Sequence, residues 1–219
     1  MIGNSRTIAG AQRDVHPRLG ERIARHRSVP WRRPVAEHSR RAFHALVERL
    51  DPRRPIVLDA GCGTGASTAL LARRHPDAEV VGIDKSAYRL REDQEGPANL
   101  HLLRADLQDV WRLACEQGWQ LLAHYLLYPN PWPKAEHLQR RWHGHPVFPA
   151  LLALGGTIEL RTNWAVYARE FAAALAAAGV ESRRARIAAD ATPLTPFERK
   201  YLASGHGCHR VIAREASPC

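Results

Sequence analysis

The sequence has little lysine, few cysteines and no long apolar run. The lysine content bears on the source of the charge, the cysteines on metal binding and compartment, and the lack of an apolar run on membrane insertion. Of 32 basic residues only three are lysine, so arginine supplies most of the formal net charge of +10. The four cysteines form no C-x-x-C pair, which argues against metal binding and favours a reduced, cytoplasmic compartment. No stretch approaches a membrane span, and the first residues lack the apolar core of a signal peptide.

The 219 residues suffice for one substantial domain, and the composition is that of a globular protein. Charge is concentrated near the start, where residues 1–41 hold ten arginines and three acids. We expect residues 1–34 to form a basic, mobile arm, with at most a short helix near Arg18–Arg27, and residues 35–219 to form the domain. Such an arm favours binding to the phosphates of an RNA partner.

A strand, a glycine-rich turn and a helix follow one another in residues 56–74. Ile56-Val57-Leu58 indicates a buried strand that ends at Asp59. Gly61, Gly63 and Gly65 then permit positive φ angles and a close approach of a ligand to the backbone. This arrangement is typical of the first unit of a nucleotide-binding α/β fold, although the spacing differs from the G-x-G-x-x-G of dinucleotide-binding proteins.

Two further predicted strands end in an acid. Residues 79–84 end at Asp84, and residues 100–106 end at Asp106. A carboxylate at the tip of the second strand can accept hydrogen bonds from ribose hydroxyls. Three acids at the tips of successive strands therefore predict a nucleoside-binding edge of a parallel sheet.

The turn and the three acids resemble the cofactor site of class I methyltransferases, which use S-adenosyl-L-methionine (SAM). The resemblance implies a Rossmann-like α/β fold, a three-layer αβα sandwich with a seven-stranded, mostly parallel sheet whose last strand is antiparallel. It also implies that SAM is bound by Asp59, Ala60, Gly61, Gly63, Asp84, Lys85, Asp106 and Leu107.

The periodicity of the rest of the chain fits that fold. We expect helices at residues 35–50, 86–94, 107–117, 164–178 and 195–203, and another that ends near the glycines at 155 and 156. We expect strands at residues 121–127, 180–188 and 209–213, and another that begins at residue 157 and ends in residues 162–164.

A second chemical centre directly follows the strand predicted at residues 121–127. The segment Tyr128-Pro129-Asn130-Pro131-Trp132-Pro133-Lys134 has three prolines, which make the loop stiff. A stiff loop there can hold a methyl acceptor in line with the donor. His137, Arg140 and Arg141 come next, and cations beside aromatic rings suit an RNA ligand.

Residues 128–141 resemble the P-D-P-W signature of the bacterial tRNA (guanine-N7)-methyltransferases. Two later segments resemble that family in order, residues 157–164 (its T-D-W strand) and residues 194–198 (its T-x-F-E motif). The resemblance covers roughly residues 35–214 and implies methyl transfer to N7 of a guanine in tRNA. It implies that the RNA is held by Asn130, Lys134, His137, Arg140, Arg141, Asn163, Thr195 and Glu198, with Asn130 and Glu198 as catalytic residues.

Two departures keep alternatives open. Asn130 and Asn163 stand where the family has Asp, and an amide offers one acceptor where a carboxylate accepts from both donors on guanine's Watson–Crick edge. The acceptor could therefore be another base or an exocyclic amine, as in N-P-P-[YFW] methyltransferases, or the chain could bind SAM or RNA without catalysis. His206, Cys208 and His209 lack further metal ligands nearby, so we expect no metal site. The sequence leaves monomer and homodimer open.

Overall fold

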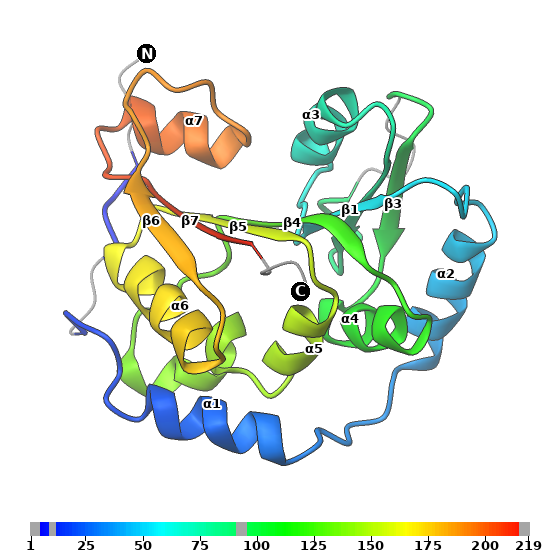
Figure 1. Cartoon of the computed structure of the whole chain (residues 1–219). Coiled ribbons are helices and arrows are strands. Elements are labelled where there is room, and N and C mark those ends of the chain that lie inside the picture. The colour runs from blue at the N-terminus through cyan, green and yellow to red at the C-terminus, as the bar shows by residue number, and fades with distance from the viewer. Residues whose placement is uncertain (1–4, 9–11, 91–95, 215–219) are drawn as a thin grey trace. The chain divides into compact units, whose positions relative to one another are not determined.

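The computed structural model describes residues 5–8, 12–90 and 96–214. Its seven strands follow the order β3-β2-β1-β4-β5-β7-β6, which confirms the predicted seven-stranded αβα fold (Figure 1). β1 pairs in parallel with β2 and β4, β2 pairs in parallel with β3, and β6 pairs antiparallel with β7. The chain separates into two compact units, and each is described by itself.

Unit 2 comprises residues 32–127 and 150–157. Its strands are β1 (Ile56–Ala60), β2 (Glu79–Asp84), β3 (Leu100–Arg104) and β4 (Leu121–Leu127). Its helices are α2 (Glu37–Val47), α3 (Ala66–Arg74) and α4 (Leu107–Glu116), and most of α5 (Phe148–Ala153) belongs to it as well. Every residue of β2 is buried, because α3 packs on this part of the sheet.

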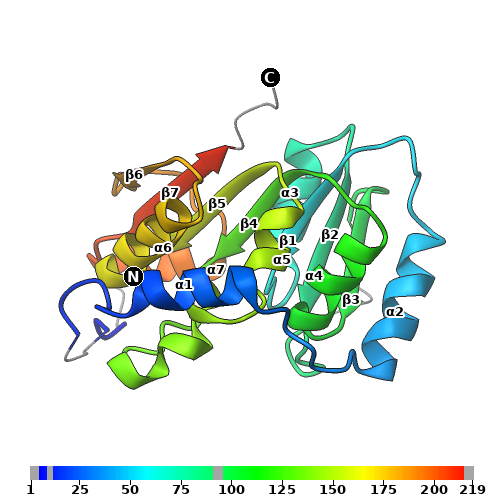
Figure 2. The same cartoon turned by 60° about the horizontal axis from the view of Figure 1, so that its bottom comes forward.

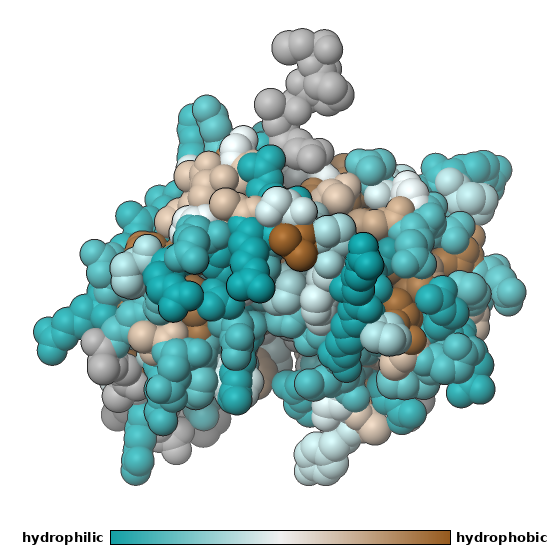
Figure 3. Space-filling model, turned by 90° about the horizontal axis from the view of Figure 1, so that it is seen from below, coloured by the Kyte–Doolittle hydropathy of each residue, from teal (hydrophilic) through white to brown (hydrophobic). Residues whose placement is uncertain are grey.

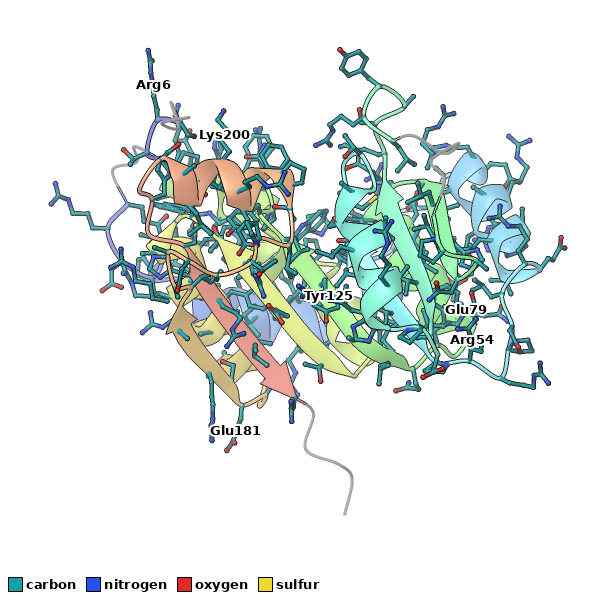
Figure 4. The ribbon with its side chains drawn as sticks, turned by 90° about the horizontal axis from the view of Figure 1, so that it is seen from above. Arg6, Arg54, Glu79, Tyr125, Glu181 and Lys200 are labelled. Carbon is teal, nitrogen blue, oxygen red and sulfur yellow. The ribbon has the colours of Figure 1, made fainter. Side chains whose placement is uncertain are left out.

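An ionic cluster joins the amino-terminal ends of three strands in unit 2. Glu79 at the start of β2 accepts from Arg54 Nη1 at 3.2 Å and lies 2.5 Å from His101 Nε2 of β3. Figure 4 shows Arg54 and Glu79 beside each other at this edge. The polar residues that follow β1, β2 and β3 lie at the opposite edge of the sheet, where these strands end.

Unit 1 comprises residues 1–31, 128–149 and 158–219. It contains α1 (Leu19–Ser28), the 3₁₀ helices η1 (Ala135–Arg140) and η2 (Trp142–Gly144), α6 (Ala165–Ala177) and α7 (Pro196–Ala203). Its strands are β6 (Ser182–Arg186), β7 (His209–Arg214) and all but the first residue of β5 (Thr157–Thr162). Leu19 and Ile23 of α1 are buried where α1 packs along α6 (Figure 2).

The amino-terminal segment differs from the predicted mobile arm. A helix does form near Arg18–Arg27, but its apolar residues are buried in unit 1, so this part of the arm belongs to the folded structure. The helix predicted at residues 86–94 is also not formed as expected, because the described residues 86–90 form a turn, and residues 91–94 lie outside the described part. The other predicted helices and strands are present, with ends shifted by a few residues.

In the described part of the chain, no helix has both the length and the apolar character needed to cross a membrane. The face shown in Figure 3 is mostly hydrophilic, with only small apolar areas. That face therefore offers no broad apolar surface.

Candidate functional site

The glycine turn after β1 is fixed to the end of β2. The amides of Gly61 and Cys62 donate to Ile83 O at 2.8 and 2.9 Å. Gly61 and Gly63 have φ angles of +83° and +62°, which any residue with a Cβ adopts only with strain. A Cβ at Gly63 would meet no atom within 4 Å, and one at Gly61 would meet only Leu107 Cδ1, at 3.8 Å. The turn thus borders open space beside Leu107.

Asp59 fixes the helix that follows this turn. Its Oδ2 accepts from Ser67 Oγ at 2.6 Å and from Thr68 Oγ1 at 2.8 Å, both in the first turn of α3. Burial raises the pKa of Asp59 to about 6, although the two hydroxyl hydrogen bonds favour its charged form. In this structure Asp59 therefore holds the start of α3, directly after the glycine turn.

Asp84 at the tip of β2 holds the glycine turn through a direct hydrogen bond. Its Oδ2 accepts from the Gly63 amide at 3.0 Å. Its Oδ1 accepts from the Ser86 amide at 2.8 Å and from Arg89 Nη2 at 3.1 Å. The sequence-predicted acid and the sequence-predicted glycine are thus brought together.

A pocket of about 380 Å³ lies beyond the ends of β2 and β3, and Lys85 and Asp106 both line it. Asp106 is also the N-cap of α4, because its Oδ1 accepts from the Gln108 amide at 3.0 Å. All eight predicted cofactor residues therefore lie in unit 2, at or just after the ends of β1, β2 and β3.

The proline-rich loop in unit 1, residues 128–134, is organised around Trp132. Its amide donates to Asn130 Oδ1 at 3.3 Å, and Arg140 lies over its ring at 4.7 Å. Tyr128 and Trp132 have φ angles of +54° and +45°, which are unusual for residues with side chains. Such strain persists only where surrounding contacts enforce it.

Arg141 supplies those contacts. Its Nη2 donates to Trp132 O at 2.9 Å and to Lys134 O at 3.0 Å, and its Nη1 donates to Glu170 of α6. The side chain is fully buried. The prediction that Arg141 holds the RNA backbone is therefore wrong for this structure, because none of its surface is available to a phosphate. Its role here is to hold the loop.

Arg140, Lys134 and Asn130 are exposed, and His137 is partly so. Lys134 lies 3.9 Å from Glu136 Oε1, and both side chains are largely solvated. His137 packs edge-on against Trp132 at 5.7 Å. These side chains give one exposed polar and cationic surface on the loop and η1.

Thr195 and Glu198 form the amino-terminal cap of α7. Thr195 Oγ1 accepts from the Glu198 amide at 2.9 Å, and the Glu198 carboxylate accepts from the Leu194 amide at 2.6 Å. Glu198 also accepts from Arg161 Nη1 of β5 at 2.9 and 3.2 Å and has no exposed surface. In this structure Thr195 caps α7, and Glu198 holds α7 against β5.

Asn163 follows β5 and is partly exposed, with Nδ2 3.2 Å from His206 Nδ1. Tyr201 of α7 stacks on His206, with ring centroids 5.3 Å apart, and on Phe197, with centroids 6.3 Å apart. Phe197 is half exposed. An amide and an open aromatic surface are thus joined within unit 1.

Comparisons with known proteins show which family the chain belongs to. Residues 53–211 match a family model described as "Putative methyltransferase". A tRNA (guanine-N(7)-)-methyltransferase of Leifsonia xyli subsp. xyli (strain CTCB07) is 32% identical over 177 residues, which cover 74% of this chain and 75% of the relative. The chain belongs to the tRNA (guanine-N7)-methyltransferase family.

A second relative of the same name, from Treponema pallidum (strain Nichols), is 33% identical over 168 residues. The match covers 72% of this chain and 66% of the relative, so the chain spans just under two thirds of that protein. The crystal structure of the antibiotic-resistance methyltransferase Kmr superposes with a TM-score of 0.56 at 23% identity and covers 81% of this chain and 94% of its own. That likeness supports the fold.

The donor of this methyltransferase family is SAM, and the residues of unit 2 fit it. No neighbouring atom lies within 4 Å of the point where a Cβ of Gly63 would stand, so the space beside this glycine is open. The Asp84 carboxylate is a hydrogen-bond acceptor suited to ribose hydroxyls. Two of the groups that donate hydrogen bonds to Asp84, the Ser86 amide and the Arg89 guanidinium, belong to the segment after β2 and not to a strand. The Asp84 carboxylate and the open space beside Gly63 are therefore compatible with a nucleoside ligand.

Sequence reasoning missed Glu170 and Arg161, the two charged residues that organise unit 1. Glu170 accepts from Arg141, from His143 Nε2 at 3.0 Å and from the His16 amide at 2.9 Å. Burial alone would raise the Glu170 pKa, but the hydrogen bond from His143 and the charge of Arg141 lower it to about 2. One signal was available, because Glu170 is a lone acid within an alanine-rich helix.

Proposed function

We propose that this chain transfers a methyl group from SAM to N7 of a guanine in tRNA. The observation that carries the proposal is the strained loop at Trp132, which Arg141 and Asn130 hold in place and which presents Lys134 and Arg140 to solvent. Family membership supplies the substrate class, since relatives at about 30% identity bear that name. tRNA and SAM are the proposed partners, and the cytoplasm is the proposed compartment.

In this proposal SAM supplies an electrophilic methyl group attached to a positively charged sulfur. The glycine turn and the acids at the strand tips bind it, with Asp59 in a supporting role. Guanine N7 would form the new bond to the methyl carbon with its lone pair while the carbon–sulfur bond breaks and the sulfur leaves as a neutral thioether. N7 has no proton to lose, so no general base is required. The chain has to position the base and stabilise the positive charge that develops on the guanine ring.

We assign base positioning to Asn130, Asn163 and Lys134, and contact with the RNA backbone to Arg140 and His137. Asn130 uses its carbonyl oxygen on the Trp132 amide, a hydrogen bond that an aspartate could make equally. The change from Asp to Asn is therefore compatible with the shape of the loop, and it removes the charge and replaces the second acceptor by a donor. We assign Thr195 and Glu198 a positioning role, because both are buried in the cap of α7.

The experiment that tests the function measures transfer of labelled methyl from SAM to unmodified tRNA, with mass spectrometry of the product nucleosides. We expect 7-methylguanosine. Another methylated nucleoside would show that the asparagines have changed the acceptor base. SAM binding without methyl transfer would show a non-catalytic relative and would refute the proposal.

The donor site has a separate test in Asp84→Asn, with the exposed Asp77→Asn as its control in unit 2. Asn keeps the shape of Asp84 but can accept from only one of the two backbone amides that the carboxylate now binds. We expect SAM affinity, measured by calorimetry, to fall about tenfold or more in Asp84→Asn, about 1.4 kcal/mol. Unchanged affinity would contradict the assigned pocket.

A further inference from the structure

A cationic pocket lies on unit 1 apart from the proline-rich loop. It has a volume of about 290 Å³ and is lined by Ala165, Arg169, Arg184, Ala185, Arg186 and His209. Its polar side chains are thus three guanidinium groups and one imidazole. They come from three elements, the amino-terminal half of α6, β6 and β7.

The strand register explains why these cations converge. Arg184 and Arg186 are two residues apart on β6, so their side chains leave the same face of the strand. His209 of β7 pairs directly with Arg186 and shares that face. Arg186 Nη2 and His209 Nε2 lie 3.4 and 3.7 Å from the point where a Cβ of Gly207 would stand, so both groups border space that glycine leaves open.

Acidic residues of the described chain neutralise this cluster only in part, because Asp14 forms an ion pair with Arg169. Arg184 and Arg186 form no ion pair with a described carboxylate, and Asp14 lies 3.4 Å from Arg169 Nε. The Arg169 Nε atom is buried and makes no hydrogen bond within the described residues. Ala165 is the first residue of α6, a helix of 13 residues, so the positive end of its dipole adds to the field.

We propose that this pocket binds a phosphate group of the RNA backbone. Arg184 and Arg186 offer planar donors that match phosphate oxygens, and the helix amino terminus favours an anion. Arg169, which also contacts Asp14 and the Arg13 carbonyl, contributes its charge. The site deepens the proposed function and rests on it for the identity of the RNA, because the cation cluster by itself specifies only the phosphate.

Burial together with the charges of Arg186, Arg184 and Arg169 lowers the pKa of His209. A bound phosphate dianion would reverse part of that electrostatic effect. The His209 pKa is therefore a reporter of occupancy that needs no RNA and no methyl transfer.

The test compares Arg184→Gln/Arg186→Gln with Arg183→Gln/Arg210→Gln in the full chain. Each double variant removes two arginines, both from β6 in the first and one each from β6 and β7 in the control. The control pair lies on the opposite face, because Arg183 alternates with Arg184 and Arg210 pairs with Ala185. Net charge falls equally in both, so a difference between them reports the pocket.

We expect tRNA affinity, measured by fluorescence anisotropy, to fall about tenfold or more in Arg184→Gln/Arg186→Gln and less than about threefold in the control, with the salt slope reduced by about one per lost contact. We also expect inorganic phosphate to raise the His209 pKa, followed by NMR with His209→Gln for assignment, only when Arg184 and Arg186 are present. Equal affinity losses in the two variants, or an unmoved His209, would overturn the proposal. Because neither readout uses methyl transfer, failure of the proposed function would be seen separately.

Discussion

At the scale of single residues, the role of a polar side chain depends on which of its donor and acceptor atoms already make hydrogen bonds within the protein. Asn130 holds the Trp132 amide with its carbonyl oxygen. Glu198 uses its carboxylate on Arg161 and the Leu194 amide. The residue facing solvent at the loop is therefore an amide, while the acid of the late motif is internal.

Asn130→Asp tests whether the missing charge limits the reaction. Aspartate keeps an acceptor for Trp132 and adds a negative charge that stabilises a methylated guanine. We expect kcat/KM for tRNA to rise about tenfold, worth about 1.4 kcal/mol of transition-state stabilisation. Asn130→Ala, which loses the Trp132 contact as well, should lower it. A rate unchanged by both substitutions would remove Asn130 from the acceptor site.

At the scale of elements, the buried carboxylate of Glu170 connects three segments of unit 1. Glu170 of α6 contacts Arg141, which holds the loop, and the His16 amide and Gln12 Nε2 of the amino-terminal segment. The segment before α1, the loop and α6 therefore share one ionic centre. This explains why a loop with two left-handed non-glycine residues is stable.

Glu170→Gln should disturb the loop without disturbing the donor site. The change leaves the Arg141 guanidinium buried without its counter-charge, which costs about 3 kcal/mol or more of unfolding free energy. We expect methyl transfer to fall sharply while SAM affinity, a property of unit 2, is unchanged. Urea unfolding and calorimetry measure these effects, and the exposed Glu181→Gln is the control. Normal transfer would refute the positioning role of Arg141 and Glu170.

Helix α1 has its own test, because a mobile arm and a packed helix respond differently to truncation of an apolar side chain. Ile23 is 1% exposed, and Val29 just beyond the helix is 55% exposed. We expect Ile23→Ala to lower unfolding free energy by about 2–4 kcal/mol and Val29→Ala to change it by less than about 0.5 kcal/mol. Equal, small effects would restore the prediction of a mobile arm.

At the scale of the whole molecule, buried titratable groups set how stability depends on pH. Burial lowers the pKa of His124 from 6.5 to about 3, so between these values the unfolded chain binds a proton that the folded chain excludes. Stability from this group is therefore lost as pH falls from about 6.5 to about 3. Asp59, with its pKa raised to about 6 by burial, acts in the opposite sense between about pH 4 and 6.

His124→Gln should accordingly flatten the pH dependence. From the unfolded pKa, His124 contributes about 2–3 kcal/mol of stability loss between about pH 7.5 and pH 4.5. We expect the unfolding free energy of this variant, measured with urea, to fall between the two pH values by about 2–3 kcal/mol less than that of the parent chain. The exposed His44→Gln is the control. Parallel losses in all three proteins would show that His124 does not titrate as its burial requires.

Local sequence determined the strands, the glycine turn and the order of the family's motifs. The turn is fixed by backbone geometry, because glycine adopts the φ angles of Gly61 and Gly63 without the strain that a Cβ would bring. The strands are fixed by apolar runs such as β4, which the sequence predicted to the residue. Those properties depend on neighbours in the chain and can be predicted without a fold.

Tertiary structure alone decided which charges are exposed and which are internal. Adjacent arginines show this most clearly, because Arg140 lies in solvent over Trp132 while Arg141 is buried against Glu170. The partners of Arg141 include Glu170 and Gln12, which are 29 and 129 positions away, so no local pattern distinguishes the two arginines. The convergence of Arg169, Arg186 and His209 likewise requires the pairing of β6 with β7 and the packing of α6, which long-range contacts establish.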